Sequence, residues 1–314
     1  MENPIVKPQP KALSDTEEMQ KRIEALAELA KQREQEEQPA QACKVVQLPL
    51  WPEAVRAVPN VCLRSALFGA IRKGRRRYLQ DELIAAVDGL EVRYRGERLD
   101  QRDLDVYESL LHLLRDQPLG KECHTTSYAL LKLMGMRDTG GERGSRAVLH
   151  RSLMRLGANM VQVRAIGRYS YAGSLIDDVS RDEKTSEYVI TLNPKLKALF
   201  APDQYTQIQW AIRRELEGHQ LAQWLHGFYS SHAQPYPIKV ETLHRLCGSE
   251  TERMDHFREK LRKALDAVIA ACIAQGESFR YRIEGGVVSV DRTPSKAQQR
   301  HIIQKSTKRR SQAT

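Results

Sequence analysis

Two short stretches of this 314-residue chain follow one pattern: LLKLMG at residues 130–135 and LHRLCG at residues 243–248. Both read leucine, any residue, a basic residue, leucine, any residue and glycine. Glycine adopts the left-handed backbone conformation that ends a helix without the steric penalty of a side chain. The pattern therefore predicts two short helices, each ending in a turn.

The sequence around the two stretches repeats in the same order. Each stretch follows a helix that contains Leu-His (Leu111-His112 and Leu225-His226) and then a Gln-Pro pair. Each is followed by a polar turn, a basic amphipathic helix and a hairpin. Because the whole order recurs, a duplication explains it better than chance. This is the layout of a winged helix-turn-helix, so the sequence predicts the α+β class with two such domains in tandem.

The predicted domains follow the composition of the chain. Residues 1–60 are punctuated by proline and carry one capped helical pattern, which predicts a largely flexible N-terminal arm with one exposed helix. Residues 61–200 are the first winged-helix domain, expected to serve dimerisation or phosphate contact. Residues 201–292 are the second domain, expected to be the main DNA reader, and residues 293–314 form a basic tail.

The charge balance predicts a polyanionic partner. Fifty Lys+Arg against forty Asp+Glu leave a net charge of +10, which favours nucleic acid over a membrane. The N-terminus has no apolar core of signal-peptide length, and the longest apolar run, AVIAACIA at residues 267–274, is too short to span a bilayer. Five cysteines without a C-x-x-C pair indicate neither a zinc site nor a disulfide framework. A cytoplasmic protein is expected.

The helix that begins at Arg253 is the predicted recognition helix. Its apolar residues fall three and four apart and form one face for the core. A second face is basic, and we expect no acidic side chains on it. The alternative is that this face is an ordinary charged surface in contact with solvent. The predicted DNA contacts on this helix are Arg253, His256, Arg258, Lys260, Arg262 and Lys263. Arg280 and Arg282 alternate with apolar residues along the following hairpin and are expected to point outward from a wing.

The first half carries a second set of candidate DNA contacts. The equivalent helix presents Arg143, Arg146, His150, Arg151 and Arg155. They contact phosphate or form a solvated face, and the sequence leaves both open. The cluster RKGRRR at residues 72–77, which includes Arg75, Arg76 and Arg77, and the basic tail are expected to add sequence-independent attraction.

Catalytic readings are weaker. The chain has no G-x-x-x-x-G-K-[ST] phosphate loop for ATP. Asp103 and Asp105 form a D-x-D pair, but residues two apart on a helix point different ways and serve two-metal chemistry poorly. The pair His112 and Arg115 lies among leucines, as in a packed helix. We therefore expect no enzyme, no cofactor and no metal.

The stretch QLPLW at residues 47–51 lies in a polar region that offers little to bury its apolar side chains. It resembles the bacterial sliding-clamp-binding motif Gln-Leu-x-Leu-Phe. In that reading the partner residues are Gln47, Leu48, Leu50 and Trp51, and Trp51 departs from the usual phenylalanine. The alternative is that these residues staple the arm to the chain's own first domain.

Nearly the whole chain resembles the TrfA family of plasmid replication initiators. The resemblance runs from ALSDTEEMQKRIEALAELAKQREQ through QLPLW and VCLRSALFGAIRKGRRR into both helix-turn-helix halves. It implies binding to double-stranded origin repeats (iterons), opening of an adjacent AT-rich region whose single strand is a further ligand, and recruitment of the replicative helicase, the host initiator and the sliding clamp. It also implies an active monomer in equilibrium with a dimer that forms through the first domain.

Two rival functions remain open on the residues alone. A transcriptional repressor that binds operator DNA also needs paired winged helices and a basic surface, but it has no use for a clamp-binding peptide. A recombinase or relaxase would cleave a strand. Direct repeats under a footprint would separate an initiator from a repressor that binds a palindrome.

Overall fold

The fold is described from a computed structural model, which divides the chain into two compact units, Met1–Val45 and Val46–Thr314. The described residues are 20–21, 24–28, 46–72, 74, 76–182, 184–185, 187–295, 298–300 and 302–303. In the first unit the described residues are helical and exposed. All other described residues belong to the second unit, which carries both predicted helix-turn-helix halves.

An antiparallel four-stranded sheet forms one side of the first half. Its strand order is β3-β4-β7-β8, from β3 (Tyr78–Ile84), β4 (Leu90–Glu97), β7 (Met160–Ala165) and β8 (Tyr169–Gly173). In β4 and β7 buried and exposed residues alternate, because successive side chains of a strand point to opposite faces. One face of the sheet therefore packs on the core and the other faces solvent.

Helix α3 (Gln101–Leu113) lies at the centre of the first half. Asp100 caps it, accepting hydrogen bonds from the backbone N–H groups of Arg102 and Asp103, and the Asp103 side chain accepts from the Asp100 N–H. Next to α3 lie α4 (Ser127–Met134) and α5 (Ser145–Gly157). Short elements precede it: α2 (Asn60–Leu63), β2 (Phe68–Gly69) and β5 (Leu99–Asp100).

The two halves share one topology. In the first, β6 (Glu122–Thr126), α4, α5, β9 (Asp178–Arg181) and β10 (Glu187–Thr191) give the sheet order β6-β10-β9. In the second, β12 (Ile238–Lys239), α8 (Val240–Leu246), α9 (Met254–Ala274), β13 (Phe279–Glu284) and β14 (Val287–Arg292) give the order β12-β14-β13. The strands β7 and β8, which directly follow the basic helix of the first half, are not its wing counterpart, because β7 pairs with β4 and extends the four-stranded sheet. The hairpin β9–β10 holds that place.

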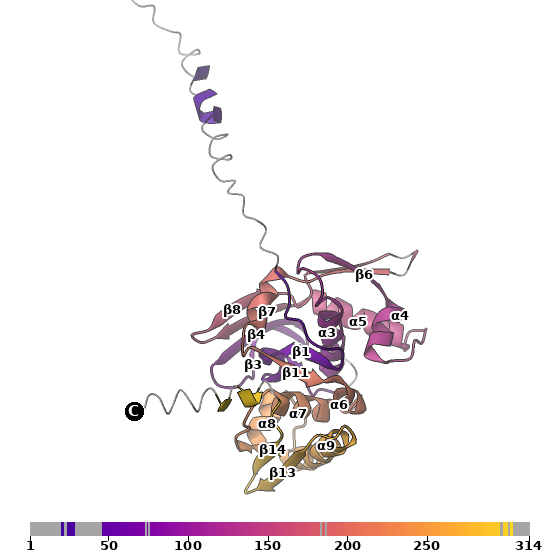
Figure 1. Ribbon diagram of the computed structural model, residues 1–314, viewed down its shortest axis with the longest axis vertical. Coiled ribbons are helices and arrows are strands. Elements are labelled where there is room, and N and C mark those ends of the chain that lie inside the picture. The colour runs from indigo at the N-terminus through magenta and orange to yellow at the C-terminus, as the bar shows by residue number, and fades with distance from the viewer. Residues whose placement is uncertain are drawn as a thin grey trace, which may run out of the picture. The chain divides into compact units, whose positions relative to one another are not determined.

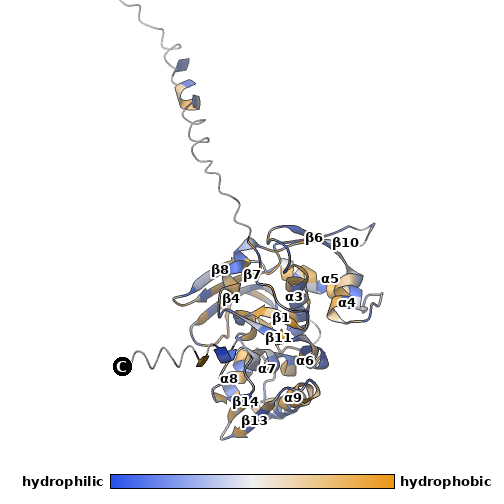
Figure 2. Ribbon diagram, viewed as in Figure 1, coloured by the Kyte–Doolittle hydropathy of each residue, from blue (hydrophilic) through white to orange (hydrophobic). Residues whose placement is uncertain are grey.

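Two hydrophobic cores lie on either side of a junction. One contains residues from Leu48 to Ile208 and the other contains residues from Ile212 to Val290. Between them the strands β1 (Val55–Pro59) and β11 (Tyr205–Gln209) pair antiparallel, as Figure 1 shows. The chain reaches β11 through η1 (Pro194–Phe200) and leaves it through α6 (Trp210–Glu215) and α7 (Gln220–Ser230). In Figure 2 much of α9 is apolar, whereas β6 is mainly hydrophilic.

The predicted flexible arm is too long at its C-terminal end. Residues 46–60 belong to the second unit, and every residue of β1 is buried. The proline-rich stretch is stabilised by pairing with β11, whose sequence lies about 150 residues away and could not be read locally. Over the ranges given above, no helix is both long and apolar enough to cross a bilayer.

Candidate DNA interface

The recognition-helix candidate α9 has the predicted buried face. Phe257, Leu261, Leu265 and Val268 are at most 1% exposed and belong to the second core. The six predicted DNA contacts of this helix, Arg253, His256, Arg258, Lys260, Arg262 and Lys263, are all exposed. Arg253 stands at the N-cap, so basic side chains lie at the end of the helix whose first backbone N–H groups have no partner within the helix.

The basic face of α9 is not free of acids, and that prediction is corrected. Arg253 pairs with Asp255 at 2.5 Å, and Lys263 pairs with Glu259 at 2.7 Å. In both pairs a hydrogen bond from the base is the main cause that lowers the pKa of the carboxyl group. Glu259 and Lys263 are four residues apart on the helix and so lie on one face, whereas Arg253 reaches Asp255 from the extended N-cap position before the helix. A phosphate would therefore compete with these carboxylates for the two bases.

The remaining bases of α9 differ in their partners. Arg258 pairs with Glu241 of α8 at 2.8 Å, and the Lys260 ammonium donates to the Thr251 hydroxyl at 3.1 Å. Arg262 forms no ion pair with any residue that the structure describes. Arg262 is thus the cation on this helix that needs no rearrangement to meet DNA.

The hairpin after α9 has the predicted outward arginines. Arg280 and Arg282 of β13 are exposed, and Arg282 lies 3.3 Å from Glu284. The turn at Gly285 and Gly286 has φ of 56° and 76°, which suits a two-residue hairpin turn. The Tyr281 hydroxyl donates to Asp266 of α9 at 2.7 Å and ties the hairpin to the helix.

The basic helix of the first half, α5, and the loop before it keep four candidates at or near the surface, and Arg143 lies in that loop. Arg143 and Arg151 are exposed, and the Arg151 guanidinium donates to the Glu142 carbonyl at 3.1 Å. Arg146 forms two bonds to Asp138, of 2.6 and 2.7 Å. The half-buried His150 lies with its Nδ1 atom 3.0 Å from the Tyr188 hydroxyl, which joins α5 to β10. Arg146, His150 and Arg151 thus already have polar partners within the chain.

Two predicted DNA contacts are structural instead. Arg155 and Arg76 both bind the fully buried Asp103, each at 2.7 Å, and Arg76 also binds Asp100 at 2.6 Å. Both arginine side chains are only 13% exposed. They neutralise a buried carboxylate, which would be costly to leave unpaired. Arg77 is exposed and pairs with Glu82, and Arg75 lies outside the described residues.

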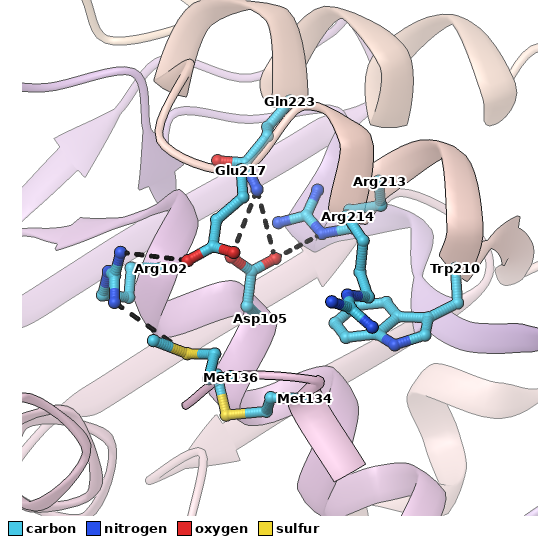
Figure 3. A pocket seen from close by; sticks show the side chains of 9 residues that line it. All are labelled: Arg102, Asp105, Met134, Met136, Trp210, Arg213, Arg214, Glu217 and Gln223. Atoms are coloured by element: carbon cyan, nitrogen blue, oxygen red, sulfur yellow. Dashed lines mark hydrogen bonds and ion pairs between the residues drawn. The ribbon is translucent and has the colours of Figure 1, made fainter. Parts of the chain in front are cut away.

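The D-x-D pair is divided between two ionic clusters, as helix geometry predicts. Asp103 faces Arg76 and Arg155, whereas Asp105 accepts from Arg213 at 2.6 Å and from Gln223 at 3.2 Å. Figure 3 shows the Asp105 carboxylate between the Arg213 and Gln223 side chains. The cavity beside them measures about 20 Å³, room for roughly one water molecule.

The predicted clamp-binding residues fold back on the chain itself. We call residues 47–54 the strap. Leu48 and Trp51 are 3% and 4% exposed within the first core, and the Trp51 ring stacks on Phe200. The Gln47 amide donates to the Arg115 carbonyl at 3.2 Å, whereas Leu50 is 66% exposed. In this structure the strap has the staple arrangement, and clamp binding stays a prediction.

His112 of α3 holds the strap in place. The Trp51 indole N–H donates to His112 Nδ1 at 2.9 Å, and Nε2 lies 2.7 Å from a Glu53 oxygen. Because Nδ1 accepts, the proton of a neutral ring sits on Nε2 and points at Glu53. Burial is the main cause that lowers the pKa of His112, although the hydrogen bond to Glu53 opposes it. The His112–Arg115 pair is therefore part of the strap anchor.

Sequence analysis missed two arginines that bind the ends of the repeated helices. The Arg214 guanidinium donates to the Gly135 carbonyl, and the Arg98 guanidinium donates to the Gly248 carbonyl, both at 2.8 Å. Each arginine comes from the half that does not contain its glycine. The only sequence signal was the repeated glycine itself, which says nothing of its partner.

Comparison with known proteins agrees with this architecture. The profile of the family described as TrfA protein matches residues 12–277. The plasmid replication initiator protein TrfA of Escherichia coli is 31% identical over 269 residues, or 78% of this chain and 68% of that protein. Domains 2 and 3 of RctB superpose with a TM-score of 0.50 at 14% identity, over 76% of this chain and 98% of that chain. The Pi initiator protein in complex with iteron DNA aligns at a TM-score of 0.44 and 12% identity.

These matches differ in what they show. The RctB likeness concerns the fold alone, and the Pi alignment is too distant to support a conclusion. The family profile spans most of the chain, and the Escherichia coli relative is more than 30% identical over more than two thirds of each protein. The chain belongs to the TrfA family.

Proposed function

We propose that this protein initiates plasmid replication by binding origin repeats through two winged helix-turn-helix domains. The observation that carries the proposal is the repeated β-α-α-β-β topology, in which each half presents an exposed basic helix after a glycine turn. A helix in this position enters the major groove in proteins of this architecture. Membership of the TrfA family supports the same role, since the Escherichia coli relative is a plasmid replication initiator.

In this proposal the second domain, residues 201–292, is the main reader of sequence. Arg253, His256 and Arg262 on α9 would meet base edges or phosphates, and Arg280 on β13 would reach the flanking backbone. The first domain, residues 61–200, would contact phosphate through Arg143 and Arg151. The tail, residues 293–314, would add sequence-independent attraction.

The partners extend this proposal. Opening of AT-rich DNA, recruitment of the replicative helicase with the host initiator, and an inactive dimer are proposed from the family resemblance. Binding of the sliding clamp through Gln47, Leu48, Leu50 and Trp51 would require the strap to leave the first core, because Leu48 and Trp51 are buried there. A protein that acts on plasmid DNA would work in the cytoplasm.

Footprinting on the origin of the plasmid that encodes this chain tests the proposal. We expect protected direct repeats, with both recognition helices contacting each repeat. Protection of a single palindrome at a promoter would instead indicate a repressor. Absence of any specific protection at physiological salt would contradict both functions.

A further inference from the structure

The two repeated glycines are each held by an arginine from the opposite half. Gly135 ends α4 of the first half, and its carbonyl accepts from Arg214 of α6, which packs in the second core. Gly248 follows α8 of the second half, and its carbonyl accepts from Arg98, which lies between β4 and β5. Both distances are 2.8 Å. The contact is thus reciprocal between equivalent positions of the duplication.

Both glycines are suited to this contact. Their φ angles are +68° and +61°, a conformation that other residues rarely adopt. A Cβ atom at Gly135 would overlap the Arg214 guanidinium, and one at Gly248 would crowd that of Arg98. The carbonyl groups at a helix C-terminus lack partners within the helix and carry partial negative charge, so a guanidinium suits them. The glycine therefore ends the helix and also makes room for the arginine.

Further polar contacts surround both arginines at the junction. Arg98 also pairs with Glu250 at 2.9 Å, beyond the same turn, and the Ala70 N–H donates to the Cys247 carbonyl at 2.7 Å. Beside Arg214, Arg213 is fully buried and binds Asp105 of α3. Figure 3 shows Arg213 and Arg214 coming from α6, with the Arg213 guanidinium beside the Asp105 carboxylate.

We infer that Arg98 and Arg214, together with the buried Arg213–Asp105 pair beside them, hold the two helix-turn-helix units at one distance and rotation, so that the protein reads two base segments at one spacing. The inference rests on the proposed function. Both arginines act on the turn that precedes a recognition helix, so they are positioning residues and need not touch DNA. One inserted base pair displaces a segment by about 3.4 Å and rotates it by about 35°. If α5 and α9 are held in one relative position, they cannot both contact the shifted segments, whereas they can do so if that position varies.

The test compares the Arg98→Ala/Arg214→Ala double variant with the unmodified protein on two duplexes. One carries the natural repeat, and the other has one base pair inserted between the two footprinted segments. We expect the insertion to weaken binding of the unmodified protein by about tenfold and that of the double variant by less than about threefold. Arg93→Ala is the matched control, because Arg93 is an exposed arginine paired with Asp81 within β3 and β4. It should keep the full insertion penalty.

A second measurement needs no DNA. Spin labels at Ala158→Cys after α5 and at Ala270→Cys on α9, with Cys43 and Cys123 changed to serine, report the distance between the two units. We expect one narrow distance distribution in the labelled parent and a broader one after loss of both arginines. If the double variant melts early, Arg214→Ala alone is used, because that side chain is exposed.

The outcomes separate the two proposals. Failure of the unmodified protein to prefer its repeat overturns the proposed function, whatever the labels report. Specific binding by the unmodified protein, with the same insertion penalty in the variant, overturns the positioning role. An unchanged narrow distance distribution in the variant also overturns it.

Discussion

His226 is a buried histidine of α7 whose Nδ1 atom has no hydrogen-bond partner among the described residues. Burial, with the positive charges of Arg213 and Arg292, lowers its pKa to about 3. The unfolded chain has a histidine pKa of about 6.5, so between these values the unfolded state binds more protons. The free energy of unfolding therefore falls as the pH drops below about 6.5, because protonation of His226 favours the unfolded chain.

Comparing the unmodified protein with His226→Leu cancels the contributions of the other titrating groups. Between pH 7 and pH 5 the unfolding free energy of the unmodified protein should fall by about 2 kcal/mol relative to that of His226→Leu. Urea unfolding of both proteins at the two pH values measures it. A difference that does not change with pH would show that His226 is not held neutral by the core.

Arg155 illustrates how a helical pattern can mislead. Its spacing places it with the basic residues of α5, but it binds Asp103, which lies 52 positions earlier. Arg155→Ala should lower the unfolding free energy by about 1–3 kcal/mol, because Asp103 keeps only Arg76. Arg151→Ala on the same helix should leave stability unchanged, as an exposed control. If Arg155→Ala weakens DNA binding while melting normally, Arg155 is a DNA contact after all.

At the scale of elements, the strap contains one buried side chain that packs in the core, Trp51, and one exposed side chain that could contact a partner, Leu50. Trp51→Ala should lower stability by about 3–5 kcal/mol, because it empties a large space beside Phe200. Leu50→Ala should change stability by less than about 0.5 kcal/mol, since Leu50 is 66% exposed. Thermal melting of both variants distinguishes the two positions.

The same pair tests the proposed clamp contact. Leu50→Ala should weaken binding to a purified sliding clamp without any loss of stability, because a truncated anchor loses contact only in the complex. Detaching the strap costs free energy, which lowers the apparent affinity of the unmodified protein for the clamp. No binding by the unmodified protein at micromolar clamp would make the strap a purely structural element.

Local pattern predicted the helices better than it predicted the strand partners. In the second half, the 3.6-residue period of α9 was sufficient to predict that helix, and the glycine pair was sufficient to predict the β13–β14 hairpin. In the first half both β7–β8 and β9–β10 are hairpins, and only their pairing with β4 or with β6 tells them apart. The C-terminal end of the predicted arm was placed wrongly for the same reason, because the sequence before residue 46 is polar and the core on which the strap packs comes from residues distant in the chain.

At the scale of the whole molecule, DNA opening requires a source of free energy. The sequence contains no G-x-x-x-x-G-K-[ST] motif, and we expect the opening proposed above to draw on the free energy of DNA binding. Several copies on adjacent repeats can bend the duplex, and a basic surface can capture an exposed strand. Arg76 cannot serve for capture, because it is tied to Asp100 and Asp103. The exposed Arg77, which pairs with Glu82, is the described arginine of this cluster chosen for the test, and Arg75, which lies outside the described residues, is changed with it.

We therefore predict that the purified protein makes AT-rich DNA beside its repeats reactive to a single-strand probe on a supercoiled plasmid. The opening should proceed without ATP hydrolysis by this protein, and host factors should enhance it. Arg75→Glu/Arg77→Glu should reduce the reactivity more than it reduces specific duplex binding, because a captured strand exposes flexible phosphates that need nearby cations. Relaxed plasmid is the control, since negative supercoiling helps to separate the strands. Occupied repeats with no reactivity, even with host initiator and architectural proteins present, would leave a protein that binds its sites and represses.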